Sequence, residues 1–121
     1  MRREQQELER ILQHIVEAIA AIESYVDGST FEQFRLDQRT QDAVLFKIVV
    51  AGEASRDIER LFPEYAQAHP ELPLAQAYRM RNRIAHGYAT IDLVIVWRTA
   101  TENLPALKLQ LLQLHPSLID R

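Results

Sequence analysis

Apolar residues in the first part of the chain follow the repeat of an α-helix. They recur at intervals of three and four residues: Leu8, Ile11, Leu12, Ile15, Ile19 and Ile22. This spacing puts them on one face of a helix, which we expect to run from about Glu4 to Val26. The turn-forming residues Asp27-Gly28-Ser29 then end it.

A second long helix is expected from about Gln41 to Phe62. Its first half, residues 43–51, is apolar on nearly every side, so we expect more than one neighbour to cover it, a second subunit among them. A β-strand is the alternative for so branched a run. We prefer the helix because Gly52-Glu53-Ala54 continues it at helical spacing without a turn signal.

Short helical turns and breaks connect the long elements. Thr30 stands three residues before Gln33, which predicts a capping box and a short helix ahead of a connection at residues 37–40. Prolines then interrupt the pattern before a third helix, Leu74 to His86, for which we expect Gly87 to supply a left-handed stop.

A fourth helix begins at Thr90 or Asp92, and Pro105 should kink or interrupt it because proline lacks a backbone donor. We expect its buried stripe to be Val94, Trp97, Leu104, Leu107 and Leu111. Four helices with short connections predict an all-α, up-and-down four-helix bundle with short extra helical turns, forming one domain over residues 1–121.

Composition excludes several classes of function. Cysteine is absent, so disulfides and thiol chemistry are ruled out, and the formal net charge of -3 argues against a protein that coats nucleic acid by bulk attraction. The four histidines are dispersed and no Gly-rich phosphate loop occurs, so we expect no metal site, no cofactor and no dedicated ATP pocket. Without an apolar leader or membrane span, the expected location is the cytoplasm.

Positive charge is nevertheless concentrated in one short segment. From Arg79 to Arg98 the chain carries four arginines against one carboxylate, Asp92. Within this segment Arg81, His86 and Tyr88 form the pattern Arg-x4-His-x-Tyr. The basic segment therefore coincides with the residues best suited to act on a phosphate.

This pattern resembles the motif of HepT-like toxins, which belong to the HEPN superfamily of helical ribonucleases. Similar residues recur along essentially the whole chain: Phe31 to Phe34, Asp37, Asp42-Ala43-Val44, Gly52-Glu53-Ala54, Leu72-Pro73, Ile91-Asp92, Val96-Trp97 and Leu104-Pro105. The resemblance implies a HEPN-type bundle, a homodimer whose motifs face one another, and a metal-independent endoribonuclease with Arg81 and His86 as its catalytic pair.

The resemblance also implies a partner and a form of control. HepT-like toxins pair with a small MntA-type nucleotidyltransferase antitoxin in a type VII-like toxin–antitoxin system. By this resemblance, the antitoxin would transfer AMP to the tyrosine of the motif, here Tyr88. A bulky anionic nucleotide two residues from His86 would block RNA and compete for Arg81.

The chemistry of the motif is consistent with ribonuclease activity. RNA carries its own nucleophile, the 2′-hydroxyl, so an enzyme needs only to move protons and stabilise charge on phosphorus. Histidine exchanges protons near neutral pH, which suits His86 to proton transfer. Arginine offers a fork of donors to phosphate oxygens, which suits Arg81 to that role. Asn82 is a supporting residue that could orient either group.

Helix geometry leaves a question open. Arg81 and His86 lie about 140° apart around an ideal helix, whereas Asn82 and His86 share a face. Either the helix loosens near Gly87, or the active site combines residues of two subunits. The alternative function is a noncatalytic helical module that binds a nucleotide or supports a nucleotidyltransferase. For Glu53, the alternative to a catalytic role is a structural role as a hydrogen-bonding residue.

Overall fold

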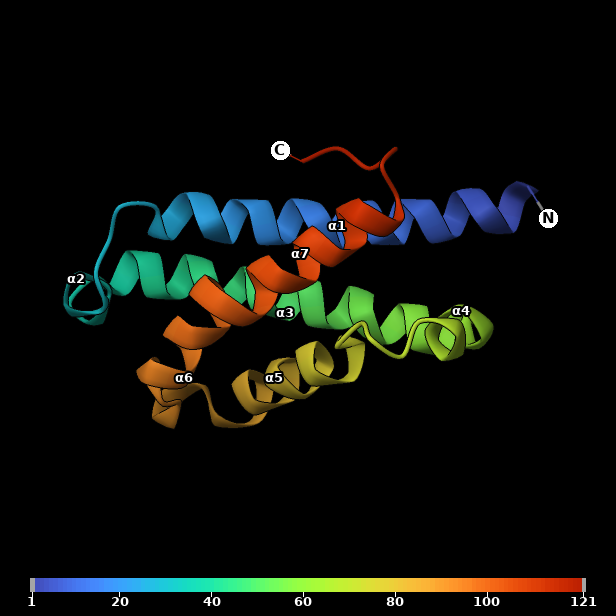
Figure 1. Cartoon of the computed structure of the whole chain (residues 1–121). Coiled ribbons are helices and arrows are strands. Elements are labelled where there is room, and N and C mark those ends of the chain that lie inside the picture. Colours follow the sequence, from blue (N-terminus) through green and yellow to red (C-terminus); the bar gives the residue numbers. More distant parts are fainter. Residues whose placement is uncertain (1, 121) are drawn as a thin grey trace.

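The computed structural model describes residues 2–120, and helices dominate them (Figure 1). Their order along the chain is α1 Arg2–Val26, α2 Phe31–Arg35, α3 Gln38–Leu61, α4 Pro63–Ala68, α5 Leu74–Gly87, η1 Tyr88–Thr90, α6 Leu93–Arg98, η2 Thr99–Asn103 and α7 Leu104–Leu114. No strand is assigned within residues 2–120. The all-α prediction is confirmed.

Four long segments form an up-and-down bundle, as expected. Helices α1 and α3 lie side by side and run in opposite directions, and α5 packs along α3 (Figure 1). The last segment, α6–η2–α7, returns across the bundle and packs on α1. The short elements α2, α4 and η1 occupy the connections, and of these α4 and η1 were not anticipated from the sequence.

Side-chain caps fix several helix boundaries. The capping box between Thr30 and Gln33 is present, which confirms that prediction. Helix α3 begins at Gln38 rather than near Gln41, because the carboxylate of Asp37 accepts a hydrogen bond of 3.1 Å from the backbone N–H of Thr40. Asp92, one of the two expected starts of the last segment, caps α6 through the N–H of Val94 at 2.8 Å.

Two expectations about the second half of the chain are wrong. Gly87 has φ of −143°, so it does not end α5 in the left-handed conformation; the chain continues instead into the 3₁₀ turn η1. Val94 is 45% exposed, and Val96, two residues later, is fully buried in its place. The cap at Asp92 sets this register, because it fixes which face of α6 meets the core.

Pro105 interrupts the last segment as predicted. The five residues before Leu104 form a π-helical turn, and the N–H of Leu104 bonds to the carbonyl oxygen of Thr99, five residues earlier. Proline cannot donate to the helix, so the widened turn adjusts the backbone hydrogen bonds beside it. The same turn carries Thr99 and Asn103 toward α5, where a cavity lies.

The core lies where α1, α3 and α7 meet. Its fully buried side chains include Ile15, Ile19, Val44, Ile48, Leu107 and Leu111. Burying each such side chain contributes about 1.5–3 kcal/mol, so this junction is the main source of stability. Trp97 packs against Phe34 with ring centroids 5.2 Å apart, which confirms its predicted packing role and ties α2 to α6.

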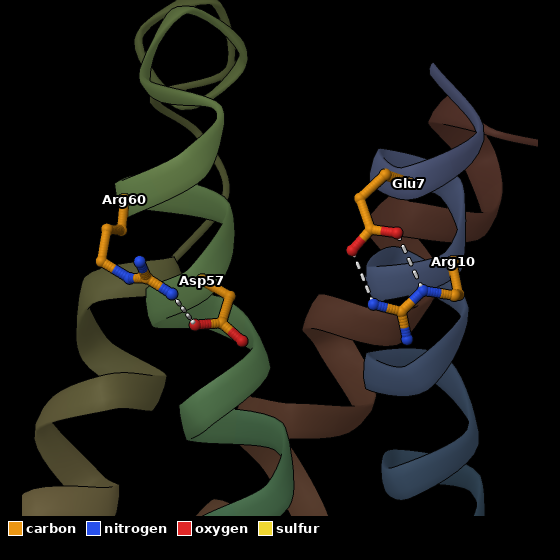
Figure 2. Close-up of polar contacts among 4 residues, drawn as sticks. All are labelled: Glu7, Arg10, Asp57 and Arg60. Carbon is orange, nitrogen blue, oxygen red and sulfur yellow. Dashed lines mark hydrogen bonds and ion pairs between the residues drawn. The ribbon is translucent and has the colours of Figure 1, made fainter. Parts of the chain in front are cut away.

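Exposed ion pairs lie on the outer surfaces of α1 and α3. Glu7 pairs with Arg10 at 2.6 Å, and Asp57 pairs with Arg60 at 3.2 Å, in both cases across one helical turn (Figure 2). Such exposed pairs contribute little to stability. Among the described helices, none is both long and apolar enough to cross a membrane.

Candidate functional site

Helices α3 and α5 approach closely at one point, where Gly52 of α3 faces α5. A Cβ atom placed on Gly52 would lie 2.9 Å from the carbonyl oxygen of Ala77 and would also collide with the side chain of Arg81. A side chain at this position would therefore push the helices apart. The absence of one allows α3 to hold the base of the Arg81 side chain in place.

The guanidinium of Arg81 is held by neighbours on both helices. Its Nε lies 2.5 Å from Oε1 of Glu53 on α3, and its Nη1 donates to Oδ1 of Asn82 at 3.0 Å. The Nε–H is not aimed at Oε1, so this contact is an ion pair without an aligned hydrogen bond. The Arg81 side chain is only 28% exposed, so its guanidinium is held in position but remains accessible to a ligand.

His86 lies in the last turn of α5 and is exposed to solvent. Asn82 stands one turn earlier on the same face. Helix α5 includes both Arg81 and His86, and the departure from helical geometry comes only after them, at Gly87 with its φ of −143°. No hydrogen bond or ion pair joins Arg81 to His86 in the part of the chain that the structure describes. On an ideal helix the two side chains lie about 140° apart.

Tyr88 begins the 3₁₀ turn after α5, and its hydroxyl donates a hydrogen bond of 2.8 Å to Oδ1 of Asp42 on α3. The same oxygen accepts a second bond, also 2.8 Å long, from the Gln38 amide. The bond to Asp42, aided by the charge of that carboxylate, raises the pKa of Tyr88 above its ordinary value of 10. Tyr88 is 54% exposed, so its neutral hydroxyl is both oriented and accessible.

Sequence reasoning did not identify the stripe of α3 that supports the motif. Asp42 holds Tyr88 and Glu53 pairs with Arg81, while Phe46 lies between them in the sequence. These three residues fall within about 40° of one another around the helix axis. Phe46 is 64% exposed, which leaves a large aromatic side chain open to solvent beside the site. Their shared helical face was the signal available in the sequence.

The charges of the site suit an anion better than a metal ion. Within residues 2–120 no three His, Asp or Glu side chains gather as a possible metal-ligand set. Arg81 instead offers a braced fork of donors, and His86 offers an accessible imidazole at the carboxyl end of α5, where a cation is favoured. A guanidinium and an imidazole are groups that suit charge stabilisation and proton transfer at a phosphodiester.

A helical bundle with an Arg-x4-His-x-Tyr motif at the end of one helix defines a protein of the HEPN class. The family model described as Ribonuclease HepT-like matches residues 15–114, and the chain therefore belongs to the HepT-like ribonuclease family. No solved structure gives a significant match to this chain.

Two relatives illustrate the similarity. The chain is 37% identical over 97 residues to "Probable ribonuclease HepT" of Thermococcus cleftensis, a match that covers 80% of this chain and 86% of that protein. It is 31% identical over 107 residues to "Gamma-glutamylcyclotransferase and putative RNase" of Methanocaldococcus jannaschii. That match covers 88% of this chain but only 47% of the relative, which is the longer protein.

Proposed function

We propose that this chain is a metal-independent endoribonuclease of the toxin type, with RNA as its substrate and Arg81 and His86 as its catalytic pair. The observation that carries the proposal is the placement of the motif. A braced guanidinium and an exposed imidazole lie on the final turns of α5 in a member of the HepT-like family. Asn82 supports the pair by accepting a hydrogen bond from Arg81.

The cleavage step needs no group outside the substrate and the protein. The 2′-hydroxyl oxygen of one nucleotide attacks the adjacent phosphorus, and the bond from that phosphorus to the 5′-oxygen of the next nucleotide breaks. His86 takes the proton of the 2′-hydroxyl and returns a proton to the leaving 5′-oxygen. Arg81 binds the phosphate oxygens as charge develops on them. The products are a 2′,3′-cyclic phosphate and a 5′-hydroxyl.

The site is shared between two copies of the chain. Arg81 and His86 lie about 140° apart around an ideal helix, and both precede the departure from helical geometry at Gly87. The α3 stripe of Asp42, Phe46 and Glu53 lies beside the motif and presents an exposed aromatic side chain. Packing this stripe against a second copy would bury Phe46 and bring the two motifs to one interface, with Arg81 of one copy opposite His86 of the other.

Purified protein in EDTA provides the test of the activity. We expect it to cleave RNA, and we expect Arg81→Ala and His86→Ala each to lower the rate by about 100-fold or more while circular dichroism stays helical. Binding without turnover would identify the noncatalytic module instead. If activity disappears in chelator and returns with a divalent metal, metal independence is wrong.

Complementation tests the shared site. A dimer that contains one Arg81→Ala chain and one His86→Ala chain has one intact site and one site without either residue. Mixing the two inactive variants should therefore restore up to about a quarter of the parental activity. Phe46→Glu should shift the parent from dimer to monomer in analytical ultracentrifugation. Mixtures without activity, from variants that do exchange subunits, would place both residues in one copy.

Control by a partner is the second part of the proposal. A cognate MntA-type nucleotidyltransferase antitoxin in the cytoplasm would join the Tyr88 oxygen to the α-phosphorus of ATP. Pyrophosphate would leave and the phenol proton would pass to solvent. The hydrogen bond to Asp42 supports this because it orients an accessible hydroxyl. The attached AMP would block RNA at His86 and compete for Arg81.

The Tyr88→Phe variant separates control from cleavage. With the nucleotidyltransferase, ATP and Mg²⁺, we expect the parent chain to gain the mass of AMP on Tyr88 and to lose its ribonuclease activity. Tyr88→Phe should still cut RNA, because cleavage does not use the phenol, and it should escape modification. Peptide mass spectrometry measures both. Modification of Tyr88→Phe at the parental rate, or full activity of the modified parent, would refute this mechanism.

A further inference from the structure

A cavity of about 370 Å³ opens on the side of α5 that faces α6, η2 and α7. Its floor is apolar and buried, formed in part by Met80, Leu104 and Leu107. Its rim is basic, with Arg79 and Arg83 from α5. The volume lies near the lower end of small-molecule sites, which span about 300–1,000 Å³. This is room for a group the size of one nucleobase with its sugar.

The cavity is lined by three arginines: Arg79, Arg83 and Arg98. No carboxylate is among the lining residues. None of the three guanidinium groups has a hydrogen bond or an ion pair to another described residue. Elsewhere Arg10, Arg60 and Arg81 each pair with a carboxylate. An apolar floor under unpaired guanidinium groups fits a ligand with an aromatic part and a phosphate.

The cavity also aligns with His86 along α5. Arg79 and His86 differ by only about 20° around an ideal helix axis and by about 10 Å along it, and Arg83 lies between them. A strand whose reacting phosphate lies at His86 would therefore pass over Arg83 toward the cavity. The π-helical turn adds Thr99 and Asn103 to the lining, and such turns are frequent at binding sites.

We infer that this cavity binds one unpaired nucleotide of the RNA substrate, next to the bond that is cut. The base occupies the apolar floor, and the arginines of the rim hold its phosphate. The inference rests on the proposed ribonuclease function, because it takes the strand position from His86. It gives these guanidinium groups, which have no partner among the described residues, a partner in the phosphate backbone.

Binding of an uncleavable ligand tests the cavity without relying on turnover. The probe is a fluorescent 2′-O-methyl RNA oligonucleotide, in which the attacking hydroxyl is blocked. We expect Arg83→Ala and Arg98→Ala each to weaken binding about tenfold in fluorescence anisotropy. In cleavage assays the Arg98→Ala loss should appear as a rise in KM rather than as a fall in kcat. Arg60→Ala, which removes an arginine paired with Asp57, is the matched control and should bind as the parent does.

Two further ligands distinguish the occupant. An oligonucleotide with an abasic site at the cavity position should bind about tenfold more weakly, since it lacks the stacked base. Free AMP should bind more weakly than the strand, because it lacks the contacts at His86. The inference is overturned if Arg98→Ala binds like Arg60→Ala, if every abasic position is tolerated, or if AMP binds as tightly as the strand. Tight binding without cleavage would contradict the ribonuclease proposal but would still support the cavity as a nucleotide-binding site.

Discussion

The arginines on the two sides of α5 differ in whether their guanidinium groups have partners. On the side that faces α3, Arg81 is packed against Gly52 and paired with Glu53, so its guanidinium is fixed in one place. On the side that faces α6 and α7, Arg83 of α5 and Arg98 of α6 line the cavity, and neither guanidinium has a hydrogen bond or ion pair to another described residue. A reacting group benefits from a fixed position. A group that follows a flexible strand needs free charge and tolerates motion.

The same substitution on the two sides should have very different effects. Lysine keeps the charge but loses the planar fork, so Arg81→Lys should lower the rate of RNA cleavage by about 100-fold. Arg98→Lys should cost only about threefold, because a point charge still attracts phosphate. Steady-state kinetics on one RNA substrate measure both. Equal losses in the two variants would contradict the division of roles.

Gly52 is the point at which the fixed side can be disturbed without touching a charge. Gly52→Ala should push α5 away from α3, lower the free energy of unfolding by about 1–3 kcal/mol and lower activity. Gly28 is the matched control, since its φ of +72° in open space makes alanine strained there as well. Gly28→Ala should cost about 1–2 kcal/mol and leave cleavage unchanged. Urea unfolding and RNA cleavage, measured on both variants, separate positioning from stability. If both variants cleave alike, Gly52 does not position Arg81.

A cluster around His115, which lies away from both sides of α5, should make the free energy of unfolding depend on pH. Tyr65 contacts Nε2 of His115 at 2.6 Å, and burial, with the charge of His69, lowers the pKa of His115 below its ordinary value of 6.5. The unfolded chain therefore binds this proton more readily than the folded chain. The free energy of unfolding should fall as the pH drops through 6.5 and level off below the folded-state pKa.

The His115→Gln variant measures that contribution. It should lack this part of the decline between pH 7.5 and 5.5 in urea unfolding, because glutamine does not take up a proton. An identical pH dependence in the parent and the variant would show that His115 is not responsible. Cleavage rates, compared at one pH where both proteins are folded, should not differ, since His115 ends α7 and is not among the motif residues.

The smallest effect is expected where an arginine is both exposed and paired. Arg60→Ala removes the ion pair with Asp57 on α3 (Figure 2). It should change the free energy of unfolding by less than about 1 kcal/mol, because exposed pairs lose most of their attraction to solvent. Cleavage and RNA binding should stay at the parental level. A strong loss of RNA binding would mean that pairing does not distinguish the two kinds of arginine.

The helical repeat of α1 and the motif on α5 could be predicted because both depend on neighbours in sequence. The exposure of Val94 could not, since the register of α6 depends on how Asp92 caps it and on which face meets the core. The partners of Arg81 and Tyr88 were also missed. Glu53 and Asp42 lie far from them in sequence and meet them only when α3 packs against α5.

The cavity was beyond sequence reasoning for the same reason. The concentration of arginines from Arg79 to Arg98 was visible, but the lining joins α5 to a π-helical turn whose position follows from Pro105 and the return of α7 across the bundle. Local propensity predicts a break near proline. Only the packed helices determine that the break faces a basic rim over an apolar floor.

The most direct test of the central claim uses RNA with one 2′-deoxynucleotide on the 5′ side of a mapped cleavage point, incubated with the protein in EDTA. If the neighbouring hydroxyl attacks phosphorus with the help of His86 and Arg81, cleavage stops at that bond and continues elsewhere. The remaining products then carry 2′,3′-cyclic phosphate ends, which mass spectrometry identifies. Cleavage that persists at the modified position would mean that another nucleophile attacks, and it would contradict the account.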